Sequence, residues 1–495
     1  MSDYIRINPA DNVAVALADL KAGTEAFGIT LCEDIPRGHK FTLAPLRAGA
    51  DIIKYGFPTG HVTRDCGAGT LVDHSCIETN LKGLQEYSYA PVPCPLPPAP
   101  AGNPTFEGFV RADGQVGIRN QIWIIPTVGC VNGIAGTLAE RFRAEIAGKE
   151  GSVDAVVAFP HNYGCSQLGD DHENTRTILA DMVRHPNAGG VLIVALGCEN
   201  NQIGPFMEKV GAVDSARVRT LEVQKVQGDE TEAGLELLRG IFAACSGDRR
   251  TPVSVSRLRI GLKCGGSDGL SGITANPLLG VLSDRLAACG GTTVLTEVPE
   301  MFGAETILMN RCASRELFDK TVKLINDFKA YFLKAGMPVY ENPSPGNKAG
   351  GISTLEEKSL GCTQKSGSGP VRGVLSYGER IREAGLNLLS APGNDLVAST
   401  ALAAAGCQMV LFTTGRGTPF GSFVPTMKIS TNTPLFENKP RWIDFNAGVL
   451  AQGTAMEKVA DAFWDFVIEV ASGRPVNNEN NGWREIAIFK TGVTL

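Results

Sequence analysis

Two apolar runs, Val153–Phe159 and Val191–Leu196, each end directly in a cluster of polar side chains. Between them, apolar residues recur at helical spacing over Asn174–Arg184. This order predicts a strand, a polar loop, a helix, a second strand and a second polar loop, as in a parallel α/β sheet. Because ligands of such sheets bind beyond the carboxyl ends of the strands, both polar loops are candidate functional sites.

The same alternation extends along most of the chain. Further buried strands are predicted at apolar runs bounded by glycine or polar residues: Gln121–Pro126, Leu258–Leu262, Thr292–Thr296 and Met409–Thr414. Further helices are predicted where apolar residues recur at helical spacing: Ala135–Ala147, Asn276–Cys289 and Arg315–Ala335. The pattern predicts two doubly wound α/β domains, at 106–250 and 256–495. Within the second, Glu341–Gly369 has little regularity, which is typical of a functional loop or lid.

The first part of the chain has a different pattern. Over residues 1–89, short β-like runs alternate with glycine turns such as Arg37-Gly38-His39 and Ala48-Gly49-Ala50. This predicts a small β-rich domain with tight turns. Residues 90–105 are rich in proline and are predicted to form a stiff, extended linker.

Length and composition are those of an ordinary multidomain globular protein. The chain has 495 residues, of which 43% are hydrophobic and 20% charged, and its formal net charge is −6. The negative charge argues against nucleic acid or an anionic membrane as partner. No apolar run approaches the roughly 20 residues of a membrane helix. The N-terminus lacks the apolar core of a signal peptide, and the 13 cysteines show no CxxC pair, so we expect reduced thiols in the cytoplasm.

The loop after Val153–Phe159 holds the densest group of reactive side chains: His161, Cys165, Asp170, Asp171 and His172. Consecutive aspartate and histidine side chains offer the oxygen and nitrogen ligands that Fe²⁺, Mn²⁺ or Mg²⁺ accepts. The structural alternative is that Asp170, which has capping-box spacing with Glu173, only caps a helix that starts just after Gly169, and that His172 is a solvated residue of its first turn. All six histidines precede residue 190, so histidine-dependent chemistry must come from this part of the chain.

Cysteines follow three of the predicted strands in similar settings. Cys130, Cys165 and Cys198 stand in VGC, YGC and LGC, so they can meet at one edge of the sheet. There they would suit a metal ion or an iron–sulfur cluster. The alternative is that each packs as a small apolar side chain, and the absence of closely spaced cysteines favours it.

Candidate carboxylate-binding groups lie further along the chain. The glycine-rich CGGSDGLSG, with Ser267 and Asp268, has the form of an anion site at a helix N-terminus but does not fit GxGxxG, so a carboxylate suits it better than a nucleotide. Arg416, between two glycines, can form a bidentate pair with a carboxylate, and Lys348 and Lys365 lie in the predicted lid. Glu297 and Glu300 are interpreted as surface ions.

These motifs resemble the altronate/galactarate dehydratase family over essentially the whole chain. Matching stretches include GHKF (Gly38–Phe41), IKYG (Ile53–Gly56), GIRNQIWIIPTVGCVN (Gly117–Asn132), YGCSQLGDDHENTRT (Tyr163–Thr177), CGGSDGLSGITANP and FTTGRGTPFG. The resemblance implies an antifreeze-like (SAF) β-domain followed by two Rossmann-like α/β domains. It also implies dehydration of a sugar acid such as D-altronate to a 2-keto-3-deoxy acid, 2-dehydro-3-deoxy-D-gluconate, with Fe²⁺ (or Mn²⁺ or Mg²⁺) required. Arg119 and Asn132, inside the matching motifs, join the predicted substrate contacts.

One motif departs from the family pattern. Members of the family carry His-x-His-Asn at the end of the SAF domain, whereas this chain has Asp73-His74-Ser75-Cys76 ahead of Thr79-Asn80-Leu81. Asp73 and Cys76 can still ligate a metal. The predicted metal ligands are Asp73, His74, Cys130 and Cys198.

The implied reaction needs a base for the C2 proton, an acid for the departing C3 hydroxyl and a cation that stabilises the dianionic intermediate. We predict His161 or His172 as base or acid, with Asp170 and Asp171 as metal or orienting groups. Arg416 and the CGGSDG loop are predicted to hold the substrate carboxylate, in a homo-oligomer. The alternatives are another lyase of the family, such as a galactarate dehydratase or a sulfolactate sulfo-lyase, and a non-catalytic sugar-acid-binding protein.

Overall fold

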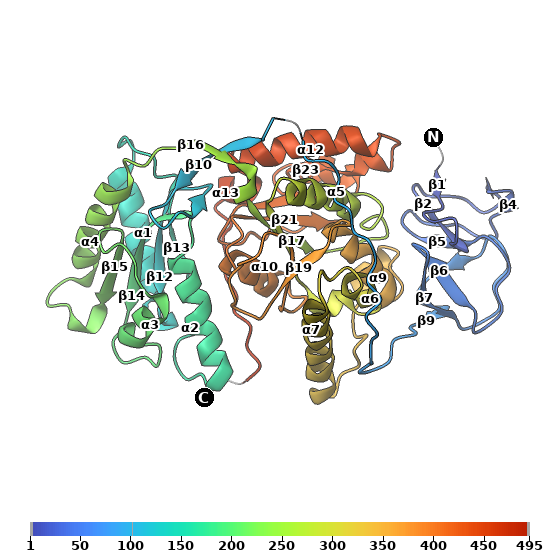
Figure 1. Cartoon of the computed structure of the whole chain (residues 1–495), viewed down its shortest axis with the longest axis horizontal. Coiled ribbons are helices and arrows are strands. Elements are labelled where there is room, and N and C mark those ends of the chain that lie inside the picture. Colours follow the sequence, from blue (N-terminus) through green and yellow to red (C-terminus); the bar gives the residue numbers. More distant parts are fainter. Residues whose placement is uncertain (1–2, 101, 493–495) are drawn as a thin grey trace.

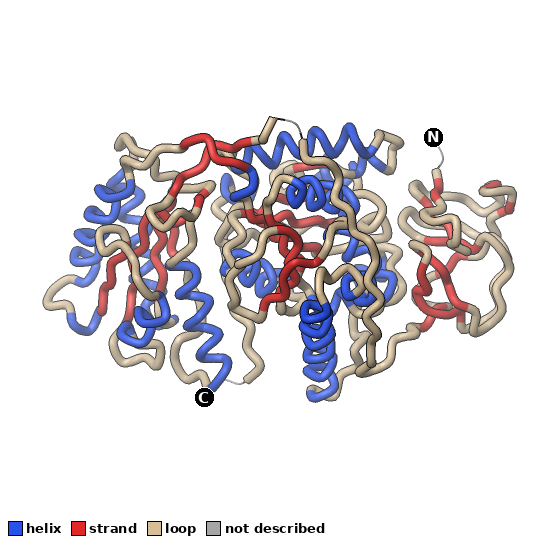
Figure 2. Tube along the Cα trace, in the orientation of Figure 1, coloured by secondary structure: helices blue, strands red, loops and turns tan. Residues whose placement is uncertain are grey.

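The computed structural model describes residues 3–100 and 102–492, which form three units side by side along the longest axis of the molecule (Figure 1). The first unit (3–80) and the second (105–254) lie on opposite sides of the C-terminal unit (255–492). The first unit contains strands and loops, whereas the other two combine strands with helices (Figure 2). In the parts of the chain that are described, no helix combines the length and apolar character needed to cross a bilayer.

The first unit is the predicted β-rich domain. One antiparallel sheet has the order β1-β2-β5-β8: β1 (Tyr4–Ile5), β2 (Val13–Ala16), β5 (Lys40–Thr42) and β8 (Leu71–Val72). A second has the order β6-β7-β9: β6 (Asp51–Lys54), β7 (Phe57–Val62) and β9 (Ile77–Glu78). The strands β3 (Glu25–Ala26) and β4 (Ile29–Thr30) form a hairpin. Two small apolar clusters form its interior.

The linker runs over the C-terminal unit without a helix or strand at 79–100 and 102–104. Its contacts are hydrogen bonds as well as packing: Tyr87 Oη donates to Glu305 Oε1 at 2.5 Å, and Tyr89 Oη donates to the Cys312 carbonyl at 2.7 Å. The linker therefore fastens the first unit to the third rather than to the second.

The second unit is a four-stranded parallel sheet in the order β13-β12-β14-β15. Its strands are β12 (Gln121–Pro126), β13 (Ala155–Ala158), β14 (Ala188–Ala195) and β15 (Val218–Glu222). Its helices are α1 (Asn132–Ile146), α2 (Gly169–Val183), α3 (Ile203–Val210) and α4 (Glu230–Cys245). Successive residues of β12 point to opposite faces, so Ile122 and Ile124 pack with α1 and α4, whereas Trp123 and Ile125 pack with α2 and α3. The predicted strands and helices of this unit are confirmed.

The C-terminal unit is built on a seven-stranded parallel sheet in the order β19-β20-β18-β17-β21-β22-β23. Its strands are β17 (Arg259–Cys264), β18 (Thr292–Leu295), β19 (Val371–Leu375), β20 (Gly385–Leu389), β21 (Met409–Thr414), β22 (Thr426–Ser430) and β23 (Phe445–Asn446). Its helices are α5 (Ala275–Ala288), α6 (Glu305–Met309), α7 (Arg315–Lys334), α8 (Pro345–Ala349), α9 (Leu355–Thr363), α10 (Asp395–Ala404), α11 (Thr433–Asn438), α12 (Met456–Ala471) and α13 (Asn477–Asn480). Helices α5 and α12 cover one face of the sheet, and α10 covers the other.

A single apolar core joins the second and C-terminal units. Trp123 and Phe159 of the second unit meet Phe423 of the third, with ring centroids 5.5 Å apart for Trp123–Phe423 and 6.1 Å for Phe159–Phe423. The same core contains residues of α2 and α10. A small sheet is formed by β11 (Val116–Gly117), β10 (Thr105–Val110) and β16 (Thr251–Ser254). It lies where the chain passes from the linker into the second unit and from the second unit into the C-terminal unit.

Two local predictions are wrong. The helix α2 does begin at Gly169, but its N-cap is Leu168 without a capping side chain, so the predicted capping box of Asp170 and Glu173 is absent. Glu173 instead pairs with Lys209 at 2.6 Å. The predicted irregular stretch at 341–369 contains α8 and α9, and every residue of α9 is buried. A helix buried on all sides presents no face to solvent, so its polar and apolar residues need not follow an amphipathic period.

Candidate functional site

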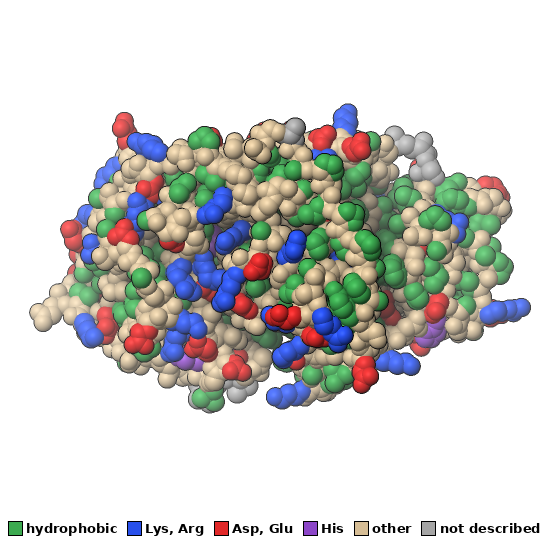
Figure 3. Space-filling model, viewed as in Figure 1, with side chains coloured by type: hydrophobic (Ala, Val, Ile, Leu, Met, Phe, Trp, Pro, Cys, Tyr) green, Lys and Arg blue, Asp and Glu red, His purple; other side chains and the backbone are tan. Residues whose placement is uncertain are grey.

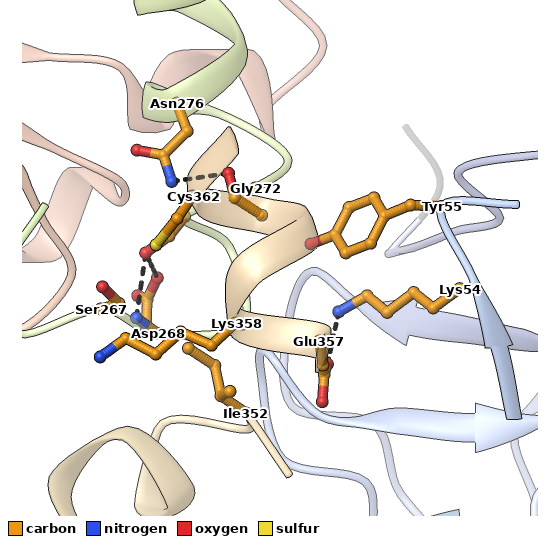
Figure 4. A pocket seen from close by; sticks show the side chains of 13 residues that line it. Lys54, Tyr55, Ser267, Asp268, Gly272, Asn276, Ile352, Glu357, Lys358 and Cys362 are labelled. Atoms are coloured by element: carbon orange, nitrogen blue, oxygen red, sulfur yellow. Dashed lines mark hydrogen bonds and ion pairs between the residues drawn. The ribbon is translucent and has the colours of Figure 1, made fainter. Parts of the chain in front are cut away.

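A dense collection of buried charged and reactive side chains lies where the first unit meets the C-terminal unit, around α9 (Figure 4). Lys54 and Tyr55 of the first unit lie on one side of this helix. Ser267 and Asp268, from the glycine-rich loop after β17, lie on the other side. These residues line a small pocket together with Lys358 and Cys362 of α9 itself. The pocket lies beyond the carboxyl end of β17, where ligands of parallel sheets bind.

Helix α9 begins at a sequence signal that is common on protein surfaces. The Thr354 hydroxyl caps it by accepting a hydrogen bond from the Glu357 backbone nitrogen. The next residues, Glu356, Glu357 and Lys358, would ordinarily be solvated, but here each is less than 8% exposed. Their charges must therefore be compensated by other buried groups.

Glu357 is held between two lysines of the first unit. Its Oε2 lies 2.9 Å from Lys40 Nζ and its Oε1 lies 2.8 Å from Lys54 Nζ, and all three side chains are at most 1% exposed. Burial works against the charge on Glu357, but the two ammonium groups lower its pKa to about 2. One carboxylate does not compensate both lysines equally: burial lowers the pKa of Lys40, whereas at Lys54 the attraction of Glu357 outweighs burial and raises the pKa.

The two units also touch through backbone that only glycine permits. A methyl group placed on Gly269 would lie 1.9 Å from the Gly38 carbonyl oxygen, and one on Gly351 would lie 2.3 Å from it. Gly351 in addition has a φ of +98°. The turn at Arg37-Gly38-His39 is thereby seated against the loop that carries Asp268, and the Arg37 charge acts on the Asp268 carboxyl.

Lys358 lies on the pocket side of α9 in a network of hydrogen bonds. Its Nζ lies 2.9 Å from Glu300 Oε1 and donates to Asn342 Oδ1 at 3.0 Å and Asn347 Oδ1 at 3.2 Å. The Cys362 thiol donates to the other oxygen of Glu300 at 3.1 Å. Burial alone would lower the pKa of Lys358, but the Glu300 carboxylate raises it, so this lysine carries its charge near neutral pH.

A second buried ion network lies deeper, at the ends of β17 and β18. Lys263 Nζ donates to Glu297 Oε1 and to Asp395 Oδ1, the latter at 2.8 Å, and Lys365 Nζ lies 2.8 Å from Glu297 Oε2. Glu297 is 1% exposed and Glu300 4% exposed. Their interpretation as surface ions is therefore wrong, because the loop after β18 turns back under α9 instead of reaching solvent.

A pair of cysteine thiols completes the floor of the site. Cys264, the last residue of β17, shares a 2.7 Å hydrogen bond between its Sγ and Ser267 Oγ. A hydrogen bond with the neighbouring Cys362 side chain lowers the pKa of the Cys264 thiol well below its usual value, although burial acts in the opposite direction. Both thiols are buried.

The structure brings together four of the six predicted substrate contacts: Ser267, Asp268, Lys348 and Arg416. Asp268 Oδ2 accepts hydrogen bonds from Thr431 Oγ1 at 2.9 Å and Asn432 Nδ2 at 3.2 Å. Burial nevertheless raises the pKa of Asp268. Lys348 lies on α8, and Arg416 reaches the same helix, donating to the Gly346 carbonyl at 3.4 Å.

The other two predicted substrate contacts have structural roles elsewhere. Arg119 is 2% exposed and pairs with Glu479 of α13 at 2.7 Å, which joins the second and C-terminal units. Asn132 donates from Nδ2 to the His161 carbonyl at 2.8 Å and so ties two loops of the second unit together.

The predicted catalytic loop lies in the second unit, on the far side of the C-terminal unit from the first (Figure 1). His161 in this loop is 5% exposed, with both ring nitrogens in backbone hydrogen bonds: Nε2 with the Pro126 carbonyl at 2.8 Å and Nδ1 with the Tyr163 nitrogen at 3.1 Å. Burial lowers its pKa to about 4, so the ring is neutral near pH 7. This environment suits a structural histidine better than a base.

The remaining candidate residues of that loop have different surroundings and do not form one site. Asp171 accepts the Thr491 nitrogen at 2.7 Å and the Gly492 nitrogen at 2.6 Å, which fixes the end of the described chain. His172 Nε2 accepts a hydrogen bond from Arg176 Nη2 at 2.7 Å, and burial lowers the pKa of this histidine. Asp170 is exposed, and Cys165 packs at the edge of an apolar core.

The four predicted metal ligands do not fit one ion. Asp73 and His74 belong to the first unit, and Cys130 and Cys198 to the second, so the C-terminal unit separates the two pairs. Cys130 and Cys198 are exposed free thiols. Over residues 3–100 and 102–492 there is no group of three or more His, Cys, Asp and Glu side chains placed to hold a metal. Cys130, Cys165 and Cys198 therefore do not form such a group either.

Sequence reasoning missed most of the charged and thiol groups at this site: Lys54, Lys263, Cys264, Glu357, Lys358 and Cys362. Two signals were present. Lys263 interrupts an apolar strand one residue before a glycine loop, and a lysine in such a strand is rarely buried without a partner. The pair Glu357-Lys358 follows a capping threonine in a segment without amphipathic period.

Comparison with known proteins agrees with this three-unit division. Residues 2–80 match the Altronate/galactarate dehydratase SAF domain, residues 108–246 the D-galactarate dehydratase/Altronate hydrolase second domain, and residues 255–494 the D-galactarate/Altronate dehydratase C-terminal domain.

Three curated relatives align over nearly the whole chain. An altronate dehydratase of Bacillus subtilis (strain 168) is 58% identical over 500 residues, covering 100% of both chains. One of Escherichia coli (strain K12) is 56% identical, covering 99% of this chain and 100% of the relative. A galactarate dehydratase (L-threo-forming) of the same bacterium is 34% identical, covering 95% and 93%.

The Glu357 network generates a prediction about the attachment of the first unit. The substitution Glu357→Gln leaves Lys40 and Lys54 buried without a carboxylate, which typically costs about 3–5 kcal/mol. We expect the first unit to detach, measured as faster proteolysis within 79–104 and a lower urea midpoint. Because the folded pKa of Glu357 is depressed, the stabilisation is present above its ordinary value of 4.5 and is lost as the pH falls towards 2.

The matched control is Glu316→Gln on the exposed face of α7, where the partner Lys320 is 54% exposed. A surface pair of this kind contributes little, so no change in proteolysis or midpoint is expected. Equal behaviour of the two variants would show that Glu357 does not hold the first unit in place.

Proposed function

The chain belongs to the altronate/galactarate dehydratase family, and on this basis we propose that it removes water from D-altronate to give 2-dehydro-3-deoxy-D-gluconate. The observation that carries the proposal is the 58% and 56% identity to two altronate dehydratases over the full length of the chain. Identity to the galactarate dehydratase is only 34%, so galactarate is the second candidate substrate. A panel of sugar acids, with 2-keto acid as the detected product, tests the choice.

We also propose that the second and C-terminal units are Rossmann-like domains. This is supported by sheets paired in parallel throughout and by helices on both faces of each. In both units the strand order reverses beside a central strand, and the polar cluster described above follows β17, the central strand of the larger sheet.

The substrate carboxylate is assigned to the cations beside α8. Over the described ranges, 3–100 and 102–492, the Lys348 side chain has no hydrogen bond or ion pair, and Arg416 has only the carbonyl of Gly346. Neither cation is neutralised by a carboxylate, so both are available to a carboxylate ligand. The guanidinium of Arg416 can bind it in bidentate geometry.

Charge stabilisation is assigned to Lys358. Removal of the C2 proton places a second negative charge on the substrate carboxylate, and a fixed ammonium in a pocket shielded from water stabilises such a charge strongly. Lys358 is 7% exposed, protonated and held in position by three side-chain oxygens.

Proton transfer is assigned to Asp268. This carboxyl group lines the pocket together with Lys358, and its hydrogen-bond partners fix its orientation. A raised pKa makes it a stronger base than an ordinary aspartate, and once protonated it can return the proton to the departing hydroxyl. The alternative assignment to His161 or His172 would place the reaction in the second unit.

A divalent ion, Fe²⁺ or else Mn²⁺ or Mg²⁺, stays a prediction from the family resemblance. Apart from Asp268, the carboxylates at or near the pocket, Glu297, Glu300 and Glu357, are each neutralised by buried lysines, so Asp268 is the one carboxylate among these four without a lysine partner. The steps above are therefore assigned to protein groups alone.

The assignment predicts that pocket variants lose activity and second-unit variants do not. Lys358→Met is expected to lower kcat roughly 10²–10³-fold because it removes the fixed charge. Asp268→Asn is expected to lower kcat roughly 10²–10⁴-fold because it removes the proton carrier. His172→Gln and the surface control Lys334→Met should retain activity on D-altronate, measured as 2-keto acid formation.

Circular dichroism of each variant separates lost chemistry from lost folding. An inactive, folded His172→Gln beside an active Lys358→Met would move the active site to the second unit. Inactivity on every sugar acid with both sites intact would instead favour a binding protein.

The role of Asp268 also predicts the pH dependence of kcat/KM. A base acts in its ionised form, so activity should rise as the pH increases through the pKa of Asp268. Because burial raises that pKa, the acid limb of the profile should lie above the ordinary value of 3.8. The variant Asp268→Glu should keep residual activity, and the acid limb of its kcat/KM profile should lie at a different pH. If the limb stays where it is in the wild type, another group is the base.

Removal of metal tests the cofactor prediction. Chelation of anaerobically purified protein should lower activity by about tenfold or more, and added Fe²⁺ should restore it. Metal content should fall in Asp73→Ala but not in Cys198→Ser, because carboxylate and imidazole suit Fe²⁺ and an isolated exposed thiol does not. Full activity after complete chelation would remove the ion from the reaction.

A further inference from the structure

A groove rich in arginine lies between the second and C-terminal units, at the opposite end of the strands from the pocket around α9. The second unit contributes Asp113–Val116 and Pro186, and the C-terminal unit contributes Arg257, Arg259 and Arg382. The groove borders the first residues of β17 and β18 and has a volume of about 360 Å³. Sites for small ligands occupy roughly 300–1,000 Å³. Figure 3 shows Lys and Arg side chains gathered over this boundary.

Arg259 in the groove is a half-buried cation without a counter-ion. Its guanidinium makes no hydrogen bond or ion pair within the described parts of the chain, residues 3–100 and 102–492. Burial lowers the pKa of Arg259, and the nearby charge of Arg257 acts in the same direction. The uncompensated charge of Arg259 is therefore energetically unfavourable in the protein alone, and a bound anion would reduce this cost.

Two guanidinium groups converge on Gly406, which leaves space between them. A methyl group placed on Gly406 would lie 3.4 Å from Arg259 Nη1 and 3.8 Å from Arg380 Nη2. Arg380 is fixed in this position by hydrogen bonds from Nη2 to Gln115 Oε1 at 2.7 Å and from Nη1 to the Asp181 carbonyl at 3.3 Å. A ligand would meet one preorganised cation and one uncompensated cation.

One of these cations, Arg380, lies 3.7 Å from the Asp181 carboxylate (Nη1 to Oδ1), whereas the acidic residues that line the groove do not pair with Arg259. Asp113 accepts hydrogen bonds from Gln115, at its backbone nitrogen and its side-chain amide. Arg382 is exposed and has no ion pair among the described residues, although Glu383 is next to it in sequence. The arrangement leaves an excess of positive charge around Gly406.

We propose that this groove binds a small anion carrying two or more negative charges, of the phosphate-ester class, held over Gly406 by Arg259, Arg380 and Arg382. Guanidinium groups match the oxygens of a phosphoryl group in bidentate geometry. Arg259 and Arg382 have no ion pair among the described residues, and a singly charged carboxylate would offset only one of them. The proposed dehydration uses none of these residues, so this is a second site.

Calorimetric titration of the full-length protein with sodium pyrophosphate tests the proposal. The wild type should bind in a saturable manner, beyond the effect of sodium chloride at equal ionic strength. Arg259→Gln should weaken binding about tenfold or more, because it removes charge-assisted hydrogen bonds. Arg382→Glu, at an exposed position where folding is not at risk, should weaken it as well. Arg315→Gln on the exposed face of α7 should leave it unchanged.

Several results would overturn the proposal. These are the absence of saturable binding, equal affinity in the wild type, Arg259→Gln and Arg382→Glu, or an equal loss in Arg315→Gln. Loss of binding in Lys358→Met would place the anion in the pocket around α9 instead. Tighter binding of the carboxylate probe tricarballylate than of pyrophosphate would contradict the phosphate assignment.

Discussion

Glu357, shared by Lys40 and Lys54, is the interaction on which the position of the first unit depends. Ion pairs buried this completely contribute little net stability, because the cost of removing three charges from water offsets most of their attraction. They do, however, strongly disfavour any other placement, since each alternative leaves a charge buried alone. The same placement seats Gly38 against Gly269 and Gly351 and so encloses the pocket on α9.

The floor of the pocket follows the same principle. Lys263, Glu297 and Lys365 neutralise one another below α9, and Lys358 and Glu300 do so beside it. Buried ions in such numbers are costly in a structure that needs only stability, and perturbed titratable groups beside a pocket are characteristic of functional sites. The ionic interior therefore marks the same pocket to which the proposed reaction steps are assigned.

The sequence predicted the fold better than it predicted the site. The strands β12, β14 and β21 and the helices α5 and α7 were recognisable because each buries one face or both, which leaves a regular apolar period. Glu300 and Glu357 were not recognised, because a charged residue gives no local sign of whether its partners lie in solvent or hundreds of positions away in the chain. His161 shows the converse: its neighbourhood is polar in sequence, yet the fold uses both ring nitrogens to join loops.

The apolar core around Trp123, Phe159 and Phe423 is shared by the second and C-terminal units. The first unit, in contrast, is attached through ion pairs, close backbone contacts and an extended linker. Lys54 and Tyr55 of the first unit line the pocket, so lifting this unit from α9 would open the pocket on that side and would separate both lysines from Glu357 together. If the substrate enters by this route, turnover cannot exceed the frequency of the opening, whatever the speed of the proton transfers inside.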